Sequence, residues 1–178
     1  MTVCVNHKTT IRNGRVFDIT VENVTFDNGF NIDLEIIRHP GASAIVPLTN
    51  NNHVVMLKQY RHAIGAFIWE IPAGTFEGRE DALVCARREL TEETGFRAGT
   101  WERLGAVTPV PGYSDECIQI FLARELTPAE QHLDQDEFLE VHKLPLSRVV
   151  EMISKGEIQD AKTVTGIFLT LQKLKTRS

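Results

Sequence analysis

The 178-residue sequence has few cysteines, no long apolar run and no excess of positive charge. Its three cysteines, Cys4, Cys85 and Cys117, are widely spaced and form no CxxC pair, which argues against a disulfide framework or a zinc knuckle. No stretch approaches the roughly 18 apolar residues of a membrane span, and the N-terminus lacks the apolar segment of a signal peptide. We therefore expect a cytoplasmic protein with no membrane partner.

The net charge of -5 argues against a general nucleic-acid binder, which normally has a basic surface. It does not exclude an anionic small molecule that a bound cation or a local arginine cluster would hold. The hydrophobic content of 42% is enough for a core, and the length suits one domain. We expect an N-terminal β extension over residues 1–40 and a main domain over residues 41–178.

Turn signals at Asn13-Gly14 and at residues 27–30 separate β-rich segments and predict an N-terminal antiparallel sheet. Residues 42–48 and 53–61 flank a polar turn and are interpreted as a core hairpin. Further strands are expected at 66–72, 101–109, 116–125 and 138–144, and helices at 80–94, 146–156 and 160–175. This order favours an α+β fold with a mixed sheet over a doubly wound repeat.

Three glutamates, Glu89, Glu92 and Glu93, fall on one face of the first expected helix, near its C-terminal end. They repel one another, and the helix dipole disfavours anions at that end. A divalent cation would reverse both penalties, and hard oxygen ligands select Mg²⁺ or Mn²⁺ over zinc. The alternative is a solvated acidic face that Arg87 and Arg88 partly offset.

The segment 74–96 resembles the Nudix box, G-x5-E-x7-R-E-U-x-E-E-x-G-U, in which U is apolar. Every fixed position is filled. The resemblance implies the Nudix fold, a mixed β-sheet between α-helices, and hydrolysis of a diphosphate by metal-activated water. The matching residues are Gly74, Glu80, Arg88, Glu89, Leu90, Glu92, Glu93, Gly95 and Phe96.

Roles follow from this resemblance position by position. Glu89 and Glu93 are expected to be the main Mg²⁺ ligands, with Glu92 as a further ligand or a water-activating group. The Ala73 carbonyl is expected to be a backbone ligand, and Arg88 is expected to orient the glutamates.

Two other positions of the box are expected to be structural. Gly74 would let the backbone turn tightly before the helix. Glu80 would lie near the helix start, where a negative charge is favourable.

Residues 60–74 resemble the segment before the box in ADP-ribose pyrophosphatases and related nucleoside diphosphate sugar hydrolases. The resemblance implies that Arg61 contacts the substrate phosphate and that Glu70 lies in the substrate pocket. Pro111, 16 residues beyond Gly95, resembles the marker of this group. Tyr113 is a candidate substrate contact. The alternatives are that Arg61 is a surface arginine, that Glu70 is a surface charge at the end of a strand, and that the segment with Pro111 is an ordinary turn.

The loop "LDQDEFLEV" resembles the segment that supplies a mobile catalytic glutamate in this group, which makes Glu137 the expected general base. Glu140 is the rival, and an acidic solvent loop is the alternative. In this group the N-terminal strands exchange between the subunits of a homodimer, and aromatic residues of these strands hold the nucleobase of the substrate. Phe17, Phe26 and Phe30 are the candidates, each of which could instead be a core residue.

The function expected from these resemblances is Mg²⁺-dependent hydrolysis of nucleoside diphosphate sugars by a homodimer. ADP-ribose would give AMP and ribose 5-phosphate. GDP-mannose or another nucleotide sugar is the alternative substrate. A hypothesis of another class is a non-catalytic Nudix domain that senses a nucleotide, although such domains usually lose the glutamates that this sequence keeps.

Overall fold

The computed structural model describes residues 2–133 and 138–176. The chain divides into two compact units. The first consists of Met1–Gly41 and Thr108–Cys117, and the second of Ala42–Val107 and Ile118–Ser178. The first unit therefore contains the segment expected to form an N-terminal extension, together with the later loop Thr108–Cys117.

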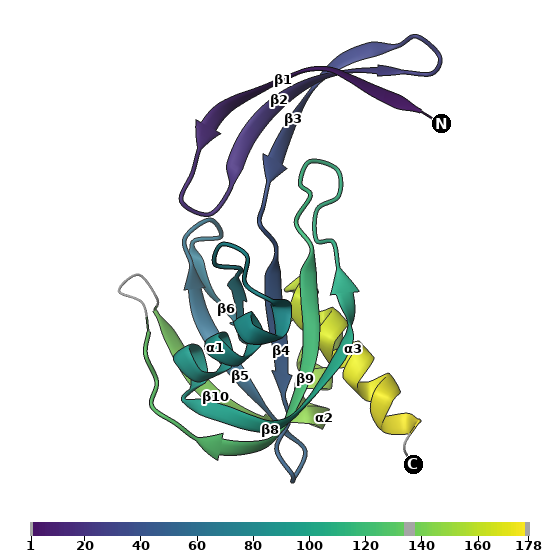
Figure 1. Ribbon diagram of the computed structural model, residues 1–178. Coiled ribbons are helices and arrows are strands. Elements are labelled where there is room, and N and C mark those ends of the chain that lie inside the picture. Colours follow the sequence, from purple (N-terminus) through teal and green to yellow (C-terminus); the bar gives the residue numbers. More distant parts are fainter. Residues whose placement is uncertain (1, 134–137, 177–178) are drawn as a thin grey trace. The chain divides into compact units, whose positions relative to one another are not determined.

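The first unit is built on a three-stranded antiparallel sheet in the order β1 (Val3–Asn13), β2 (Asp18–Phe26) and β3 (Asn31–Arg38) (Figure 1). Both turn signals are confirmed, because each separates two paired strands. The central strand β2 buries Glu22, which pairs with Arg38 at 2.6 Å and with Lys8 at 3.1 Å. These ion pairs compensate the charge of a carboxylate that is 4% exposed.

The second unit contains two sheets. The four-stranded sheet has the order β7 (Ala73–Thr75), β4 (Ala42–Pro47), β9 (Ile118–Pro128) and β8 (Phe96–Val107), with β4 and β9 parallel. The three-stranded sheet has the order β10 (Leu139–Pro145), β5 (His53–Arg61) and β6 (Ala66–Glu70), and it is antiparallel. The expected mixed sheet is thus present.

The predicted core hairpin of residues 42–48 and 53–61 is wrong, because β4 and β5 belong to different sheets. A single bridge joins Leu48, the residue after β4, to Val54 near the start of β5. Every residue of β4 is buried, and its two edges are occupied by β7 and β9. A strand buried on both faces and paired on both edges has no edge left for its neighbour in the sequence.

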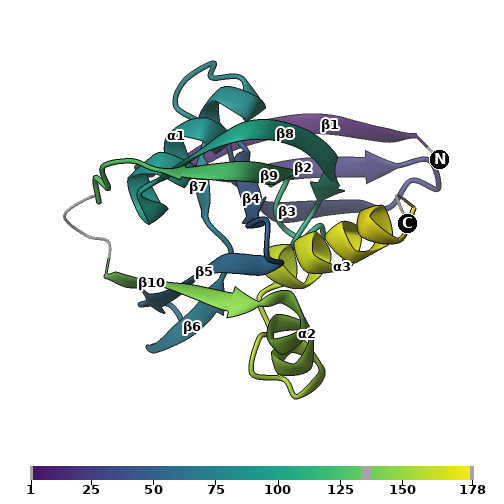
Figure 2. The same cartoon turned by 90° about the horizontal axis from the view of Figure 1, so that it is seen from below.

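Helices cover both faces of the four-stranded sheet (Figure 2). Because strand residues alternate between faces, Ile45 packs with Leu90 of α1 (Ala82–Thr94), whereas Val46 packs with Ile167 of α3 (Ala161–Lys175). The third helix, α2 (Leu146–Ser154), adds Val149 to the layer on the α3 side. Each fully buried side chain of this size stabilises the fold by about 1.5–3 kcal/mol.

The helix boundaries largely follow the sequence signals. Asp160 caps α3, since its carboxylate accepts a hydrogen bond from the Thr163 amide at 3.0 Å. Gly95 ends α1 in the left-handed conformation at φ 68°. The expected start of α1 at residue 80 is wrong, because Asp81 is the cap and Ala82 the first helical residue.

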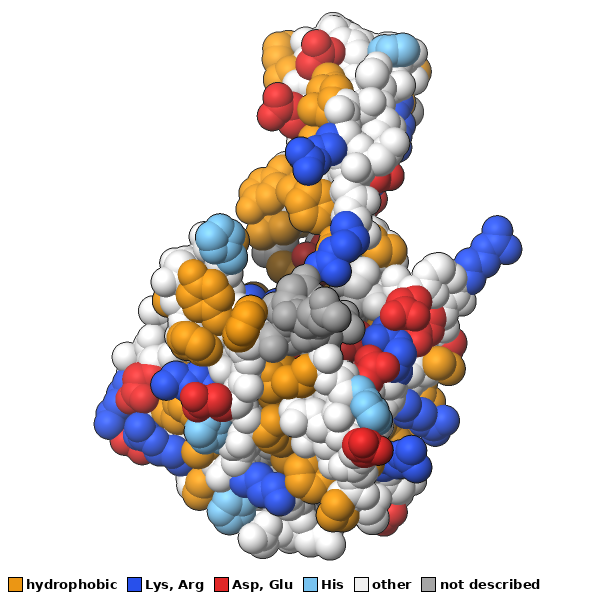
Figure 3. Space-filling model, turned by 90° about the vertical axis from the view of Figure 1, so that its left-hand side faces the viewer, with side chains coloured by type: hydrophobic (Ala, Val, Ile, Leu, Met, Phe, Trp, Pro, Cys, Tyr) orange, Lys and Arg blue, Asp and Glu red, His pale blue; other side chains and the backbone are white. Residues whose placement is uncertain are grey.

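The short strand β7 was not predicted. No helix in the described ranges is long and apolar enough to cross a membrane. Figure 3 shows acidic and basic side chains intermixed on one face of the molecule, beside groups of hydrophobic side chains.

Candidate active site

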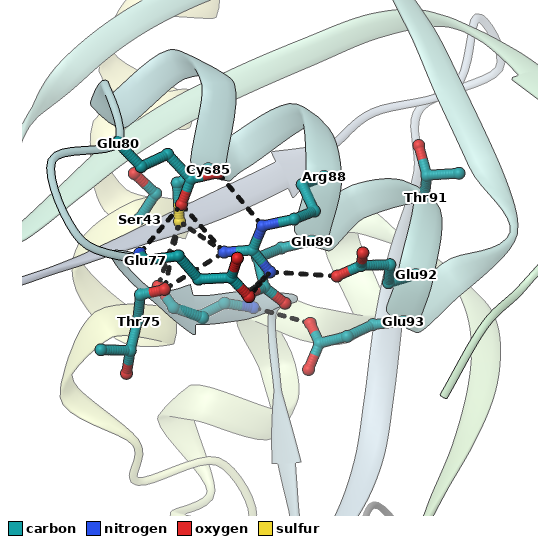
Figure 4. Close-up of polar contacts among 12 residues, drawn as sticks. Ser43, Thr75, Glu77, Glu80, Cys85, Arg88, Glu89, Thr91, Glu92 and Glu93 are labelled. Carbon is teal, nitrogen blue, oxygen red and sulfur yellow. Dashed lines mark hydrogen bonds and ion pairs between the residues drawn. The ribbon is translucent and has the colours of Figure 1, made fainter. Parts of the chain in front are cut away.

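The acidic face of α1 is formed as the helical spacing predicts. Glu89 and Glu93 are buried, at 8% and 1% exposure, and Glu92 is partly exposed. Figure 4 shows the side chains of Glu92 and Glu93 on the same side of the helix as Arg88. Two buried carboxylates one helical turn apart need compensating charge.

Arg88 supplies part of that charge. Its Nη1 donates to Glu89 Oε1 at 2.6 Å and to Glu92 Oε2 at 3.0 Å, while its Nη2 donates to the Thr75 carbonyl at 3.2 Å (Figure 4). The hydrogen bond to Glu80 is the largest cause that raises the pKa of Arg88 above its ordinary value, so the guanidinium stays charged. Arg88 thus fixes two glutamates in the way that the box resemblance implies.

Glu80 accepts hydrogen bonds from Nε and Nη2 of Arg88 at 3.1 and 3.0 Å. These bonds are the main cause that lowers the pKa of Glu80. Glu80 lies at the helix start as expected, one residue before the cap residue Asp81, and its carboxylate contacts Arg88 in the middle of α1. Its structural role is to hold Arg88, which in turn bonds Glu89 and Glu92.

Gly74 lies in β7, and its backbone is outside the left-handed region. The prediction of a tight turn there is therefore wrong. A Cβ at position 74 would lie 1.7 Å from Glu89 Oε1, so glycine is needed because the carboxylate fills that space. The Cys85 thiol donates to the Gly74 carbonyl at 3.4 Å, and burial raises the pKa of this thiol to about 12.

Ala73 joins the end of the box helix to the sheet. Its amide donates to Glu93 Oε2 at 2.8 Å, and the residue pairs with Ala44 of β4. One carboxylate oxygen of Glu93 is therefore held against the strand that carries the predicted backbone ligand.

The donor set suits a hard divalent cation. Three carboxylates project from one helix face, and Gly74 leaves room for one of them. In the present side-chain positions, no three acidic, histidine or cysteine side chains among residues 2–133 and 138–176 converge closely enough to hold a metal ion. Arg88 bonds two of these carboxylates, so a metal ion would compete with it for Glu89 and Glu92.

Arg61 and Glu70 form a bidentate ion pair with distances of 2.7 and 2.8 Å. Lys162 at the start of α3 also binds Glu70, which is 1% exposed. Burial alone would raise the pKa of Glu70, but the hydrogen bond from Arg61 and the charge of Lys162 outweigh it and lower the pKa. The surface-charge interpretation of Glu70 is therefore wrong.

This ion pair lies within electrostatic reach of the acidic face. The hydrogen bond from Glu70 is the largest cause that raises the pKa of Arg61, and the charge of Glu93 adds to it. The Arg61–Glu70 pair and the α1 glutamates thus form one polar region of the second unit.

Lys162 was not found from the sequence. It lies 92 residues from Glu70 in the chain, and it also contacts Asp160 Oδ1 at 3.1 Å. A lysine after a helix cap is common, and only the fold shows that its ammonium group meets a buried carboxylate.

Glu140 lies on the other face of the three-stranded sheet from Arg61. It is paired with Lys58 across β10 and β5, and residues 58 and 61 of one strand point to opposite faces. Its carboxylate is exposed and lies 3.0 Å from His142 Nε2. This placement does not favour Glu140 as the base. Glu137 lies outside the described residues.

Phe17, Pro111 and Tyr113 belong to the first unit. The Tyr113 carbonyl accepts a hydrogen bond from the Ile37 amide at 2.8 Å, and its side chain is 55% exposed. Phe17 is 40% exposed, whereas the rings of Phe26 and Phe30 pack 6.2 Å apart. The roles of these residues toward substrate stay predictions.

Comparison with known proteins identifies relatives over most of the chain. The chain is 41% identical over 166 residues to the methanol dehydrogenase activator of Bacillus methanolicus, and the match covers 92% of this chain and 90% of that protein. It is 40% identical over 162 residues to an ADP-ribose pyrophosphatase of Bacillus subtilis (strain 168), covering 90% and 88%. A GDP-mannose pyrophosphatase of Escherichia coli (strain K12) is 34% identical over 163 residues, covering 82% and 84%.

A solved structure described as an ADP compounds hydrolase superposes with a TM-score of 0.88 at 23% identity, over 100% of this chain and 97% of that one. This likeness confirms the fold. The model of the NUDIX domain matches residues 38–165, which include the whole box. The expected family is thereby confirmed: the chain belongs to the Nudix hydrolases.

Proposed function

We propose that this protein hydrolyses the diphosphate bond of nucleoside diphosphate sugars with the help of Mg²⁺, and that ADP-ribose is the preferred substrate, giving AMP and ribose 5-phosphate. The ADP-ribose pyrophosphatase of Bacillus subtilis supports this choice, because it is 40% identical over nine-tenths of the chain. GDP-mannose is the second candidate, supported by the 34% identical pyrophosphatase of Escherichia coli.

The observation that carries the proposal is the position of Glu89, which Arg88 and the space at Gly74 fix on the acidic face. Glu89, Glu92, Glu93 and the Ala73 carbonyl would hold Mg²⁺ or Mn²⁺. Such an ion neutralises phosphate oxygens and lowers the pKa of bound water.

The remaining residues bind and orient the substrate. Arg61, which Glu70 holds in a fixed orientation, binds a phosphate oxygen. Glu137 takes the proton of the attacking water. Tyr113, Pro111 and Phe17 contact the nucleotide. The protein acts as a homodimer in the cytoplasm.

The test is a substrate panel with purified protein and Mg²⁺, in which ADP-ribose, GDP-mannose, ADP-glucose and NADH are compared by kcat/KM. We expect ADP-ribose to have the highest value and its products to be AMP and ribose 5-phosphate. A higher value for GDP-mannose would replace the first candidate by the second. Activity that persists after chelation of divalent ions would contradict the metal dependence.

A further inference from the structure

A hollow of about 250 Å³ lies between α1 and the start of β8. Arg87 and Thr91 line it from α1, and Arg97, Ala98 and Trp101 line it from β8. None of these residues belongs to the acidic site described above. The hollow is therefore a separate feature of the second unit.

The hollow lies on the opposite side of α1 from the buried glutamates. Each helical residue advances by about 100°, so Arg87 and Thr91 lie roughly 200° around the helix from Glu89 and Glu93. Figure 4 shows the Thr91 side chain pointing away from Arg88 and its carboxylates. A ligand in the hollow would not touch the acidic face.

The charge of the hollow is positive. Among the described residues, neither Arg87 nor Arg97 makes an ion pair, and no acidic side chain lines the cavity. By contrast, Arg61 and Arg88 are each bound to carboxylates. Two neighbouring cations repel each other, and an anion between them would reverse that penalty.

The size and chemistry of the hollow suit a small oxyanion. It is smaller than the roughly 300–1,000 Å³ of pockets for drug-sized ligands. Guanidinium groups bind phosphate oxygens in a bidentate manner. The Thr91 hydroxyl donates its proton to the Arg87 carbonyl at 3.0 Å, so the two arginines are the donors that face the hollow. The Trp101 indole donates to the Ala98 carbonyl at 3.2 Å and so supplies a wall, not a donor.

We propose that this hollow binds the phosphate group of a small molecule, either inorganic phosphate or a phosphate monoester. Arg87 and Arg97 bind the phosphate oxygens, and the ring of Trp101 closes the side of the site. This site lies on the back of the helix that carries the acidic face.

Calorimetry tests the proposal directly. The protein is titrated with potassium phosphate in EDTA at constant ionic strength, so that phosphate cannot bind through a metal ion at the glutamates. We expect one saturable site, and an affinity about tenfold lower in Arg87→Gln and in Arg97→Gln, because each loses a charge-assisted hydrogen bond. Arg148→Gln, on α2, is the matched control and should keep the affinity of the unsubstituted protein.

Tryptophan emission locates the site. The sequence has two tryptophans, so Trp69→Phe leaves Trp101 as the only one. As phosphate is added, the emission of Trp101 should change with the same dissociation constant that calorimetry gives. The same titration with methyl phosphate shows whether the ester or inorganic phosphate binds more tightly. Absence of saturable binding, or equal affinities in the two variants and the unsubstituted protein, would overturn the proposal.

Discussion

Gly74 and Glu89 occupy neighbouring space so closely that a single added carbon at position 74 would lie 1.7 Å from Oε1 of Glu89. The glycine is thus required by the carboxylate and not by its own backbone conformation, which other residues can adopt. The obstacle is the end of a flexible side chain, so a larger residue would move Glu89 without preventing folding.

Gly74→Ala should therefore lower kcat for ADP-ribose by at least about tenfold, as loss of support for a metal ligand does. The thermal midpoint should change little. Gly105→Ala is the control, because its Cβ would meet only Leu169 Cδ1 at an ordinary 3.4 Å. Steady-state kinetics and circular dichroism of both variants make the comparison, and full activity of Gly74→Ala would show that Glu89 need not stay in place.

Glu93→Gln and Glu92→Gln should each lower kcat by about two orders of magnitude or more while the fold stays intact, as removal of a group that stabilises the transition state does. Calorimetry with Mg²⁺ should show weaker binding in the same variants. Glu157→Gln is the control, since Glu157 lies outside the box and its exposed carboxylate pairs with Arg148 at 3.3 Å. Retained activity in both Glu92 and Glu93 variants would count against the metal assignment.

The proposed base is tested by comparing Glu137→Gln with Glu140→Gln. Glu137→Gln should slow turnover by about 10²-fold or more and change KM less, because a general base acts in the chemical step. Glu140→Gln should be nearly neutral, since its carboxylate lies on the opposite face of the sheet from Arg61. The reverse result would assign the base to Glu140, and no effect in either would leave the glutamates of α1 as the source of the base.

The box helix and its acidic face could be predicted from the sequence because both depend on local spacing. Glu89 and Glu93 share a face through helical periodicity alone, and Asp160 is recognisable as a cap from its position before an amphipathic run. The motif predicts a glycine at position 74, but it does not reveal why a glycine is required there. The close approach of Glu89 to this position depends on two separate segments and leaves no local signal in the sequence.

Pairings between distant segments could not be predicted in the same way. The hairpin of β4 and β5 was expected because the two strands flank a polar turn, yet β4 pairs with β9, which is far away in the sequence. The contact of Lys162 with Glu70 is of the same kind. Both depend on which strand edges and helix ends the complete fold brings together.

Lys162→Met should destabilise the protein by about 2 kcal/mol, because it leaves the buried Glu70 with one cation in place of two. It should also raise KM for ADP-ribose more than it lowers kcat, since Glu70 positions Arg61 for binding. Lys155→Met is the control, because its surface pair with Glu151 should contribute about 0–1 kcal/mol. Urea unfolding and steady-state kinetics provide both readouts; unchanged values in both would remove Lys162 from the site.

The pH dependence of stability should depend measurably on Glu80. Its pKa in the folded protein is lowered below the ordinary 4.5, chiefly by the hydrogen bonds from Arg88. The unfolded chain therefore binds more protons than the folded one between these two pKa values, so this contribution is complete above pH 4.5 and is lost as the pH falls through the lower value.

Glu80→Gln should accordingly be less stable at neutral pH, by about 1 kcal/mol for one ion pair near the surface. Its difference from the unsubstituted protein should shrink as the pH falls below 4.5, because the unsubstituted carboxylate then becomes protonated as well. Urea unfolding of both proteins over this pH range gives the measurement. A difference that stays constant through the acid range would show that Glu80 stabilises the fold through packing and not through its charge on Arg88.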